Sequence, residues 1–149
     1  MNVNLIPLSD DNKEQCFKLK VAENQMQYIA SNEASFKSVK ENLKVARPFV
    51  IYCDYELVGF TMFAFDEEYE KPDDRYWLWR FMIDERQQGK GFGTAALREI
   101  IKYFKDNGAN NIRLSTKESN IKALSLYKKA GFYETGEYNG EEIVLQLDL

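Results

Sequence analysis

The stretch "DERQQGKGFGTAALREII", Asp84 to Ile101, places three glycines at every second position and then continues directly into an amphipathic helix. Glycine lets the main chain approach a ligand without interference from a Cβ atom. The first amides of a helix have no intrahelical acceptor and carry the positive end of the helix dipole. With Arg86 and Lys90 nearby, the stretch predicts an anion site, although the same glycines would also suit a plain tight turn.

Three phosphate-binding patterns compete for this stretch. A Walker A loop requires a serine or threonine after its lysine, and Lys90 is followed by Gly91, so that pattern fails. "GFGTAA", Gly91 to Ala96, fits the dinucleotide fingerprint G-x-G-x-x-A. That fingerprint follows its strand directly, whereas "DERQQ" intervenes here, and too little chain remains for a doubly wound nucleotide domain. The third pattern, "QGKGFG", Gln88 to Gly93, agrees best with its surroundings.

Length and composition predict one domain, residues 1–149, in a soluble protein. The chain has 149 residues, of which 44% are hydrophobic and 30% charged, as is ordinary for a globular domain. No apolar run approaches the ~20 residues that span a bilayer, and the first residues lack a signal-peptide pattern. Cys16 and Cys53 fit neither a metal motif nor a disulfide framework. We therefore expect a cytoplasmic location and no membrane partner.

The absence of histidine limits the chemistry. Ser–His–Asp triads, Cys–His pairs and His-ligated metal sites are excluded, and we expect no metal cofactor. The formal net charge of −4 argues against a nucleic-acid partner and favours a neutral or cationic one.

Hydrophobic periodicity predicts a mixed α/β (α+β) domain with two βα units in its second half. The dense aromatic and aliphatic run Tyr76–Ile83 is predicted to be a central strand. The other predicted strands are Val3–Pro7, Phe49–Cys53, Leu57–Phe65, Ile112–Thr116, Phe132–Glu137 and Ile143–Leu149. Helices are predicted after "SDDN" through about Ala22, at Ala34–Lys44, after the glycines as far as Asn107, and at Asn120–Lys129.

Two motifs together resemble the GNAT family of N-acetyltransferases. "QGKGFG" fits that family's pyrophosphate-binding pattern, Q/R-x-x-G-x-G/A. Downstream, "ESNIKALSLYKKAGFYETGE", Glu118 to Glu137, is similar to its second motif, an Asn before a helix with x-A-x-x-x-Y, followed by GF-x-x-x-G. The motifs lie at family spacing, and the resemblance covers essentially the whole chain. Within the family, bacterial spermine/spermidine acetyltransferases are most similar, through "ENQMQYI" (Glu23–Ile29), "LVGFTM" (Leu57–Met62) and "RFMIDERQQGKGFG" (Arg80–Gly93).

The resemblance implies a GNAT-like fold with acetyl-CoA as co-substrate. Such a fold has a central, mostly antiparallel mixed sheet of six to seven strands, a splayed V between the central strands, and about four flanking helices. By resemblance, the main chain at Phe81 and Ile83 binds the pantetheine arm, and Phe81 or Met82 donates an N–H to the thioester oxygen. The other residues that the resemblance assigns to cofactor binding are Gln88, Gly89, Lys90, Gly91, Phe92, Gly93, Thr94, Asn120, Ala123 and Tyr127.

Tyr127 occupies the family position whose hydroxyl faces the thioester sulfur, which implies a general acid for the departing thiolate. A tyrosine pKa near ~10 exceeds that of a thiol at ~8.5, so the hydroxyl stays protonated at neutral pH and can donate. Without the two motifs, a helix tyrosine packing against Leu124 would be the simpler interpretation.

The general base is less well defined. A primary amine with a pKa near ~10.4 is mostly protonated at pH 7, and its deprotonation costs about 4–5 kcal/mol. Related polyamine enzymes often carry an acidic residue on the strand before Phe81, whereas these positions are Trp79 and Arg80 in this chain. The candidate bases, acting through ordered water, are Glu23, Glu67 and Glu68.

The resemblance implies that an amine attacks the thioester directly in a ternary complex. The acidic segment "DEEYEKPDD", Asp66–Asp74, could attract a polycation by charge and cation–π contact, or could simply be a solvated loop. A polyamine is the expected acceptor. An aminoglycoside, a peptide N-terminus or a lysine is the alternative, as is a non-catalytic sensor of acyl-CoA. The oligomeric state is open, with a homodimer as one option.

Overall fold

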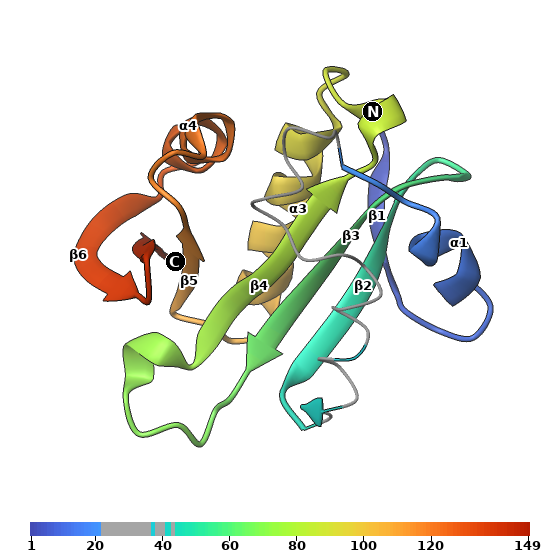
Figure 1. Cartoon of the computed structure of the whole chain (residues 1–149). Helices are drawn as coiled ribbons and strands as arrows, with labels where there is room; N and C mark the ends of the chain where they lie inside the picture. The colour runs from blue at the N-terminus through green and yellow to red at the C-terminus, as the bar shows by residue number, and fades with distance from the viewer. Residues whose placement is uncertain (22–36, 38–40, 43) are drawn as a thin grey trace.

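The computed structural model describes residues 1–21, 37, 41, 42 and 44–149. Seven strands form one sheet in the order β1-β2-β3-β4-β5-β7-β6 (Figure 1). The strands are β1 (Val3–Pro7), β2 (Ala46–Cys53), β3 (Glu56–Phe65), β4 (Tyr76–Ile83), β5 (Asn111–Thr116), β6 (Tyr133–Asn139) and β7 (Glu142–Asp148). The helices of the described residues are α1 (Lys13–Phe17), α3 (Phe92–Asp106) and α4 (Ile121–Lys129), with short 3₁₀ turns at η2 (Pro72–Asp74) and η3 (Glu85–Gln87).

Neighbouring strands run antiparallel throughout the sheet, except that β4 and β5 are parallel. The mixed, mostly antiparallel sheet predicted from the sequence is therefore confirmed. The helix predicted at Ala34–Lys44 lies almost entirely outside the described residues. Within the part of the chain that is described, no helix has the length and apolar character needed to cross a membrane.

The helix predicted to reach Ala22 is shorter, and tertiary contacts explain its end. α1 ends at Phe17. Shortly afterwards, the Lys20 N–H donates to the Asp84 carboxylate at 3.0 Å, and the Lys20 carbonyl accepts from the Glu85 N–H at 2.6 Å. These main-chain groups attach the N-terminal segment to the loop after β4, so they are not used to continue the helix.

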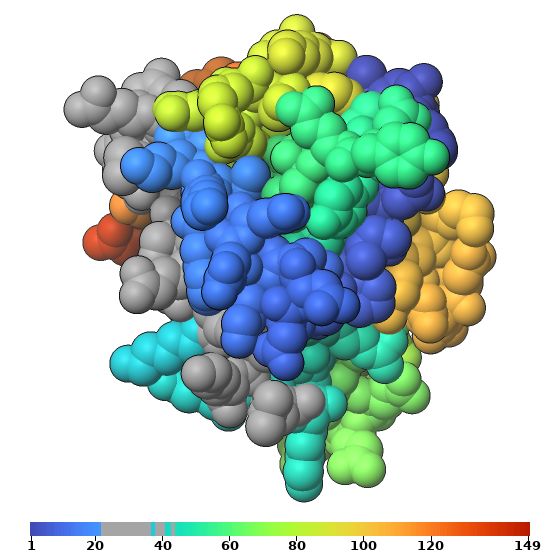
Figure 2. Space-filling view, turned by 90° about the vertical axis from the view of Figure 1, so that its right-hand side faces the viewer, coloured from blue at the N-terminus to red at the C-terminus, as the bar shows by residue number. Residues whose placement is uncertain are grey.

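A helix covers each face of the central strands. On one face, Phe104 of α3 lies against Phe63 and Phe65 of β3, with ring-centroid distances of 4.8 and 4.9 Å. On the other face, Cys16 of α1 is buried in the same cluster as Met62 of β3. Figure 2 shows the blue atoms of α1 and the orange atoms of α3 well apart, on either side of the strands. Because both faces are covered, β3 is buried along nearly its whole length.

The gap between β4 and β5 is the feature that positions the site. β4 pairs with β3 along most of its length, but β4 and β5 meet only at Trp77 and Arg113. Beyond this pair the two strands diverge toward the end at which β5 leads into α4 (Figure 1). A bulge at Trp79 interrupts the pairing of β4 with β3 and bends the strand locally. The V predicted between the central strands is therefore confirmed.

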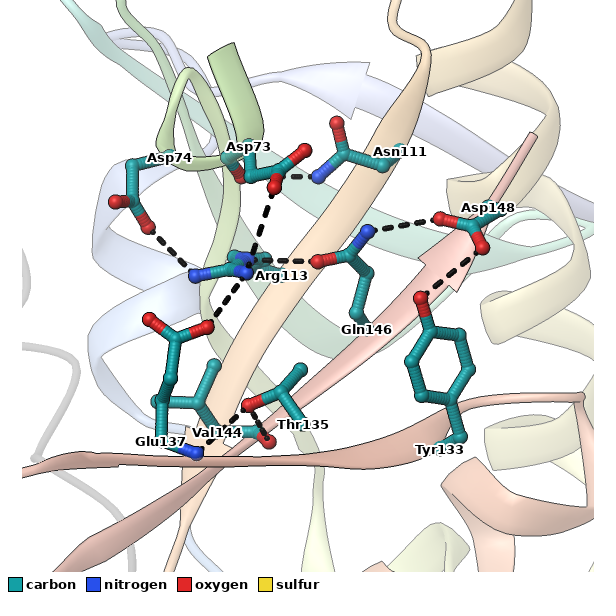
Figure 3. A network of polar contacts seen from close by, with 10 residues as sticks. All are labelled: Asp73, Asp74, Asn111, Arg113, Tyr133, Thr135, Glu137, Val144, Gln146 and Asp148. Carbon is teal, nitrogen blue, oxygen red and sulfur yellow. Dashed lines mark hydrogen bonds and ion pairs between the residues drawn. The ribbon is translucent and has the colours of Figure 1, made fainter. Parts of the chain in front are cut away.

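Arg113 lies at the closed end of this V. Its side chain is 7% exposed, and its guanidinium contacts Asp74 of η2 at 3.1 Å, Glu137 of β6 at 2.8 Å and Gln146 of β7 at 2.8 Å (Figure 3). Burial acts to lower the pKa of Arg113, but the hydrogen bond to Glu137 and the charges of Asp74, Glu137 and Asp73 raise it overall. The charged guanidinium thus joins η2, β5, β6 and β7 where β4 and β5 meet.

We expect Arg113→Met to lower the free energy of unfolding by about 2–4 kcal/mol, because it leaves several carboxylates together without their cation. Urea denaturation measures this change. The control is Lys128→Met, which removes an exposed ion pair with Glu134 at 2.9 Å and should cost less than about 1 kcal/mol. Equal losses in the two variants would contradict the structural role of Arg113.

Candidate active site

The glycine segment forms the predicted turn at the start of α3. Gly89 and Gly91 have φ values of +76° and +87°, in the left-handed region that favours glycine. Gly91 is the N-cap of α3, and no side chain of the described residues caps this helix. The Ala95 N–H donates to the Gly91 carbonyl at 3.2 Å, which leaves the amides before it at the positive end of a 15-residue helix. Such amides suit an anion.

A cavity of about 460 Å³, which we call the cofactor cavity, lies beside these amides. Its walls come from β4, the glycine turn and α4, and two lysines of α4 add positive charge. The lining residues are Val21, Phe81, Met82, Ile83, Gln87, Gln88, Gly89, Gly91, Gly93, Thr94, Asn120, Ile121, Lys122, Ala123, Ser125, Leu126, Tyr127 and Lys129.

The main chain of β4 faces this cavity at alternate residues. The Asp84 N–H donates to the Val58 carbonyl of β3 at 2.8 Å. Because main-chain groups of successive residues in an antiparallel strand point to opposite sides, those of Phe81 and Ile83 point away from β3 and into the V. The Ile83 carbonyl accepts from the Gln88 side chain at 2.9 Å. Phe81 therefore presents main-chain groups to the open side of the strand.

A second cavity of about 910 Å³, which we call the acceptor cavity, occupies the V and the sheet face beside it. It is lined by aromatic and charged side chains, including Asp66, Tyr69, Asp74, Arg75, Trp77, Trp79, Arg80, Arg113, Ser115, Glu137, Tyr138 and Glu142. Phe81, Asn120, Ala123 and Tyr127 line both cavities. A ligand bound in one cavity can therefore contact a ligand bound in the other beside these four residues.

Tyr127 lies on α4 at this meeting point. Its ring packs against Phe132 with centroids 5.6 Å apart and an interplanar angle of 63°, so it also has a packing role. Burial raises the pKa of Tyr127, because the charged phenolate is poorly solvated there. The hydroxyl is consequently a proton donor throughout the neutral range.

The structure brings together most of the residues predicted for cofactor binding, with two exceptions. Lys90 and Phe92 do not line the cofactor cavity. The Lys90 ammonium donates to the Gln87 side chain at 3.2 Å in an exposed position, and Phe92 packs with the buried cluster around Ala96. Both belong to the turn without facing its cavity.

Of the predicted bases, the two that are described, Glu67 and Glu68, are not brought to the meeting point. Glu23 lies outside the described residues, and Glu67 and Glu68 are exposed in the loop after β3, in the wall of neither cavity. Glu142 of β7 lines the acceptor cavity and was missed, because no sequence spacing relates the last strand to Tyr76–Ile83. Pairing of β7 with β5 is what places it there.

The acidic segment Asp66–Asp74 has two separate roles in the fold. Asp73 and Asp74 contact Arg113, at 3.8 and 3.1 Å, so they hold the closed end of the V. Asp66 forms no ion pair with Arg113 and lines the acceptor cavity, which Asp74 also borders. Among the described residues, no group of three or more His, Cys, Asp or Glu side chains is arranged to hold a metal ion.

The chain is similar to known acetyltransferases in sequence and in structure. Residues 14–132 match the family model described as "Acetyltransferase (GNAT) family". The spermine/spermidine N(1)-acetyltransferase of Bacillus subtilis (strain 168) is 36% identical, over 98% of this chain and 99% of that protein.

Two solved structures share the fold. Spermidine N-acetyltransferase from Vibrio cholerae, in complex with CoA and spermine, superposes with a TM-score of 0.73 at 21% identity, over 98% of this chain and 95% of that one. An aminoglycoside acetyltransferase in complex with coenzyme A superposes with a TM-score of 0.78 at 18% identity, over 99% and 95%. The family model and the B. subtilis relative define an acyltransferase. The chain belongs to the GNAT acetyltransferase family, as the two sequence motifs predicted.

Proposed function

We propose that this protein is an acetyl-CoA-dependent N-acetyltransferase that transfers the acetyl group to a primary amine of a polyamine such as spermine or spermidine. The amine attacks the thioester directly in a ternary complex. The observation that carries the proposal is the meeting of the cofactor and acceptor cavities at Phe81 and Tyr127. The B. subtilis relative, a spermine/spermidine N(1)-acetyltransferase by name, supports the choice of a polyamine.

The residues of the cofactor cavity fit acetyl-CoA. The amides that begin α3 would hold the pyrophosphate, with Lys122 and Lys129 of the same cavity adding positive charge. The open main-chain edge at Phe81 and the Asn120 side chain would hold the pantetheine arm, as an added strand binds a sheet edge. When bound, acetyl-CoA supplies the thioester whose acetyl group is transferred.

Two groups of the chain would assist transfer. The Phe81 N–H, directed into the V, is placed to stabilise negative charge on the thioester oxygen, whereas the alternation of β4 directs the Met82 N–H toward β3. The Tyr127 hydroxyl, kept protonated by burial, would donate its proton to the thiolate that departs as the C–S bond breaks, and the proton that the amine loses on forming the C–N bond would return to Tyr127 through solvent.

Direct transfer is supported by the position of both cysteines. Cys16 is a buried residue of α1, and burial raises the pKa of its thiol to about 12, so it is not a thiolate at neutral pH. Cys53 lies at the end of β2. Neither lines the cofactor or the acceptor cavity, so neither is placed to accept the acetyl group.

The walls of the acceptor cavity suit a slim aliphatic chain with cationic groups. Tyr69, Trp77, Trp79 and Tyr138 offer ring faces for alkyl segments and ammonium groups. Carboxylates in the wall of the same cavity favour a cation over a neutral ligand. Both properties match a polyamine.

Replacement of Gly93 tests the cofactor site. A Cβ at this helical position would meet only Leu126, at an ordinary 3.9 Å, so Gly93→Val should fold while its methyl groups obstruct the pyrophosphate. We expect CoA affinity, measured by titration calorimetry, to fall by at least ~10-fold with stability changed by less than about 1 kcal/mol. Lys105→Val, on the exposed last turn of α3, is the control. If the Gly93→Val protein folds and its CoA affinity is unchanged, the pyrophosphate does not bind at this turn.

The Tyr127→Phe variant tests the general acid. It keeps the ring that packs on Phe132, so stability and CoA affinity should be nearly unchanged, while kcat falls by roughly 10²–10⁴-fold. Because burial raises the pKa of Tyr127, its protonated form persists as pH rises, and wild-type kcat should show no loss from its ionisation up to about pH 10. A near-wild-type kcat in the variant would exclude this role.

An amine panel with bisubstrate kinetics tests the reaction itself. Wild-type protein should release CoA from acetyl-CoA in the presence of spermidine, and double-reciprocal plots should give intersecting lines because both substrates are bound before transfer. Aminoglycosides, peptides and lysine complete the panel. Transfer to none of the amines would refute the proposed function, and parallel lines or an acetylated cysteine in intact-mass spectra would refute direct attack.

A further inference from the structure

The charges of the acceptor cavity divide into paired and unpaired groups. Among the described residues, Asp66, Asp74, Glu137 and Glu142 are the carboxylates that line it. Asp74 and Glu137 form ion pairs with Arg113. Asp66 and Glu142 form no ion pair with any described residue. Neither carboxylate is therefore held in an ion pair within the described part of the chain, and Glu142 experiences the charge of Arg80 only from a greater distance.

Glu142 lies at the end of the cavity nearest the meeting point. The Ser115 hydroxyl of β5 donates to its carboxylate at 2.7 Å, which fixes the orientation of the side chain. Ser115 is followed by Thr116, whose hydroxyl accepts from the Asn120 side chain at 3.3 Å, and Asn120 lines both cavities. The Glu142 carboxylate is thus held against β5 in the wall of the acceptor cavity, one residue along the strand from the Thr116–Asn120 contact.

Arg80 faces this region from β4, on the other side of the V. Its Nη1 donates to the Trp79 carbonyl at 2.9 Å, whereas its Nε is buried with no hydrogen-bond partner among the described residues. Burial lowers the pKa of Arg80, and the charge of Glu142 acts in the opposite direction. An amino group bound at Glu142 would therefore also have the Arg80 cation nearby, and this like charge opposes the preference of the Glu142 carboxylate for the ammonium form.

Asp66 lies at the opposite end of the cavity. Its N–H donates to the Arg75 carbonyl at 2.8 Å, which places it level with the start of β4, beside Tyr69 and Trp77. Since Trp77 is level with Arg113, Ser115 is level with Trp79. About four residues of strand, roughly 13 Å, therefore separate the two residues along the strand direction, and three strand spacings, roughly 14 Å, separate them across the sheet, which makes roughly 19 Å between their main-chain positions.

We propose that Glu142, oriented by Ser115, binds the amino group that is acetylated, and that Asp66 binds the distal ammonium group of the same acceptor. This inference rests on the proposed function and adds a length requirement to it. The terminal nitrogens of spermidine are nine bonds apart, roughly 11 Å when extended, which allows both contacts once the carboxylate side chains reach inward. The nitrogens of 1,3-diaminopropane are only four bonds, roughly 5 Å, apart and cannot reach both carboxylates.

The test compares kcat/KM for spermidine, 1,3-diaminopropane and butylamine in single variants. Glu142→Gln should lower kcat/KM by roughly 10- to 100-fold for all three amines, as expected for loss of a charge-assisted hydrogen bond. Asp66→Asn should lower it by roughly 10-fold for spermidine and leave the two shorter amines unchanged. The controls are Glu141→Gln and Glu70→Gln, which remove the same charge at an exposed residue of the same turn or loop and should have little effect on any amine.

Ser115→Ala tests the orientation of Glu142. Ser115→Ala should lower kcat/KM for every amine by a smaller factor than Glu142→Gln does. In the Ser115→Ala/Glu142→Gln double variant, kcat/KM should be little lower than in Glu142→Gln alone, because both substitutions affect the same contact. CoA affinity should stay at the wild-type value in each variant, since these residues do not line the cofactor cavity.

The outcomes separate the two proposals. If the wild-type protein acetylates amines but Glu142→Gln has the same kcat/KM as Glu141→Gln, the role of Glu142 is overturned. The proposed acetyltransferase function is then unaffected. If Asp66→Asn lowers kcat/KM equally for all three amines, or for none, the length requirement is overturned. If wild type acetylates no amine, the proposed function fails and this inference fails with it.

Discussion

The Arg113 guanidinium lies where β4 and β5 make their single register pair, surrounded by carboxylates of η2 and β6 and by the Gln146 amide of β7. A buried cation is costly unless its hydrogen bonds are satisfied, and here side chains from several elements satisfy them. Because these elements converge on one point, the two strands are joined there and free to separate beyond it. Both cavities border the gap that results.

The separation of β4 from β5 leaves one edge of β4 without a strand partner. Buried main-chain groups must find partners, so this edge requires a ligand, a side chain or water. At Ile83 the Gln88 side chain supplies one such bond, which also ties the glycine turn to the strand. At Phe81 the main-chain groups of this edge face the cavity. An open strand edge and an uncapped helix end therefore lie side by side, which suits a ligand with an extended arm and a phosphate group.

Local patterns predicted a large part of this arrangement. The strand Tyr76–Ile83 has the predicted bounds, because a dense run of β-branched, aliphatic and aromatic residues has few alternatives to a buried strand. The turn at Gly89 and Gly91 was equally readable, since positive φ favours glycine. Sequence patterns were less reliable at the end of α1. There the Lys20 main chain forms hydrogen bonds with Asp84 and Glu85, which are distant in sequence, and these bonds replace those that would continue the helix. Hydrophobic periodicity within a segment carries no information on such long-range bonds.

By itself, the sequence determined the family, the glycine turn before α3 and the place of Tyr127 in its motif, because each depends on residues close together in the chain. The charges of the acceptor cavity were decided only by the tertiary structure. Pairing of β7 with β5 brings Glu142 to Ser115, and the contacts of Arg113 occupy Asp73 and Asp74 while leaving Asp66 unpaired. Whether a carboxylate is available to a ligand depends on which cation lies within a few ångströms of it, and strand order sets that distance.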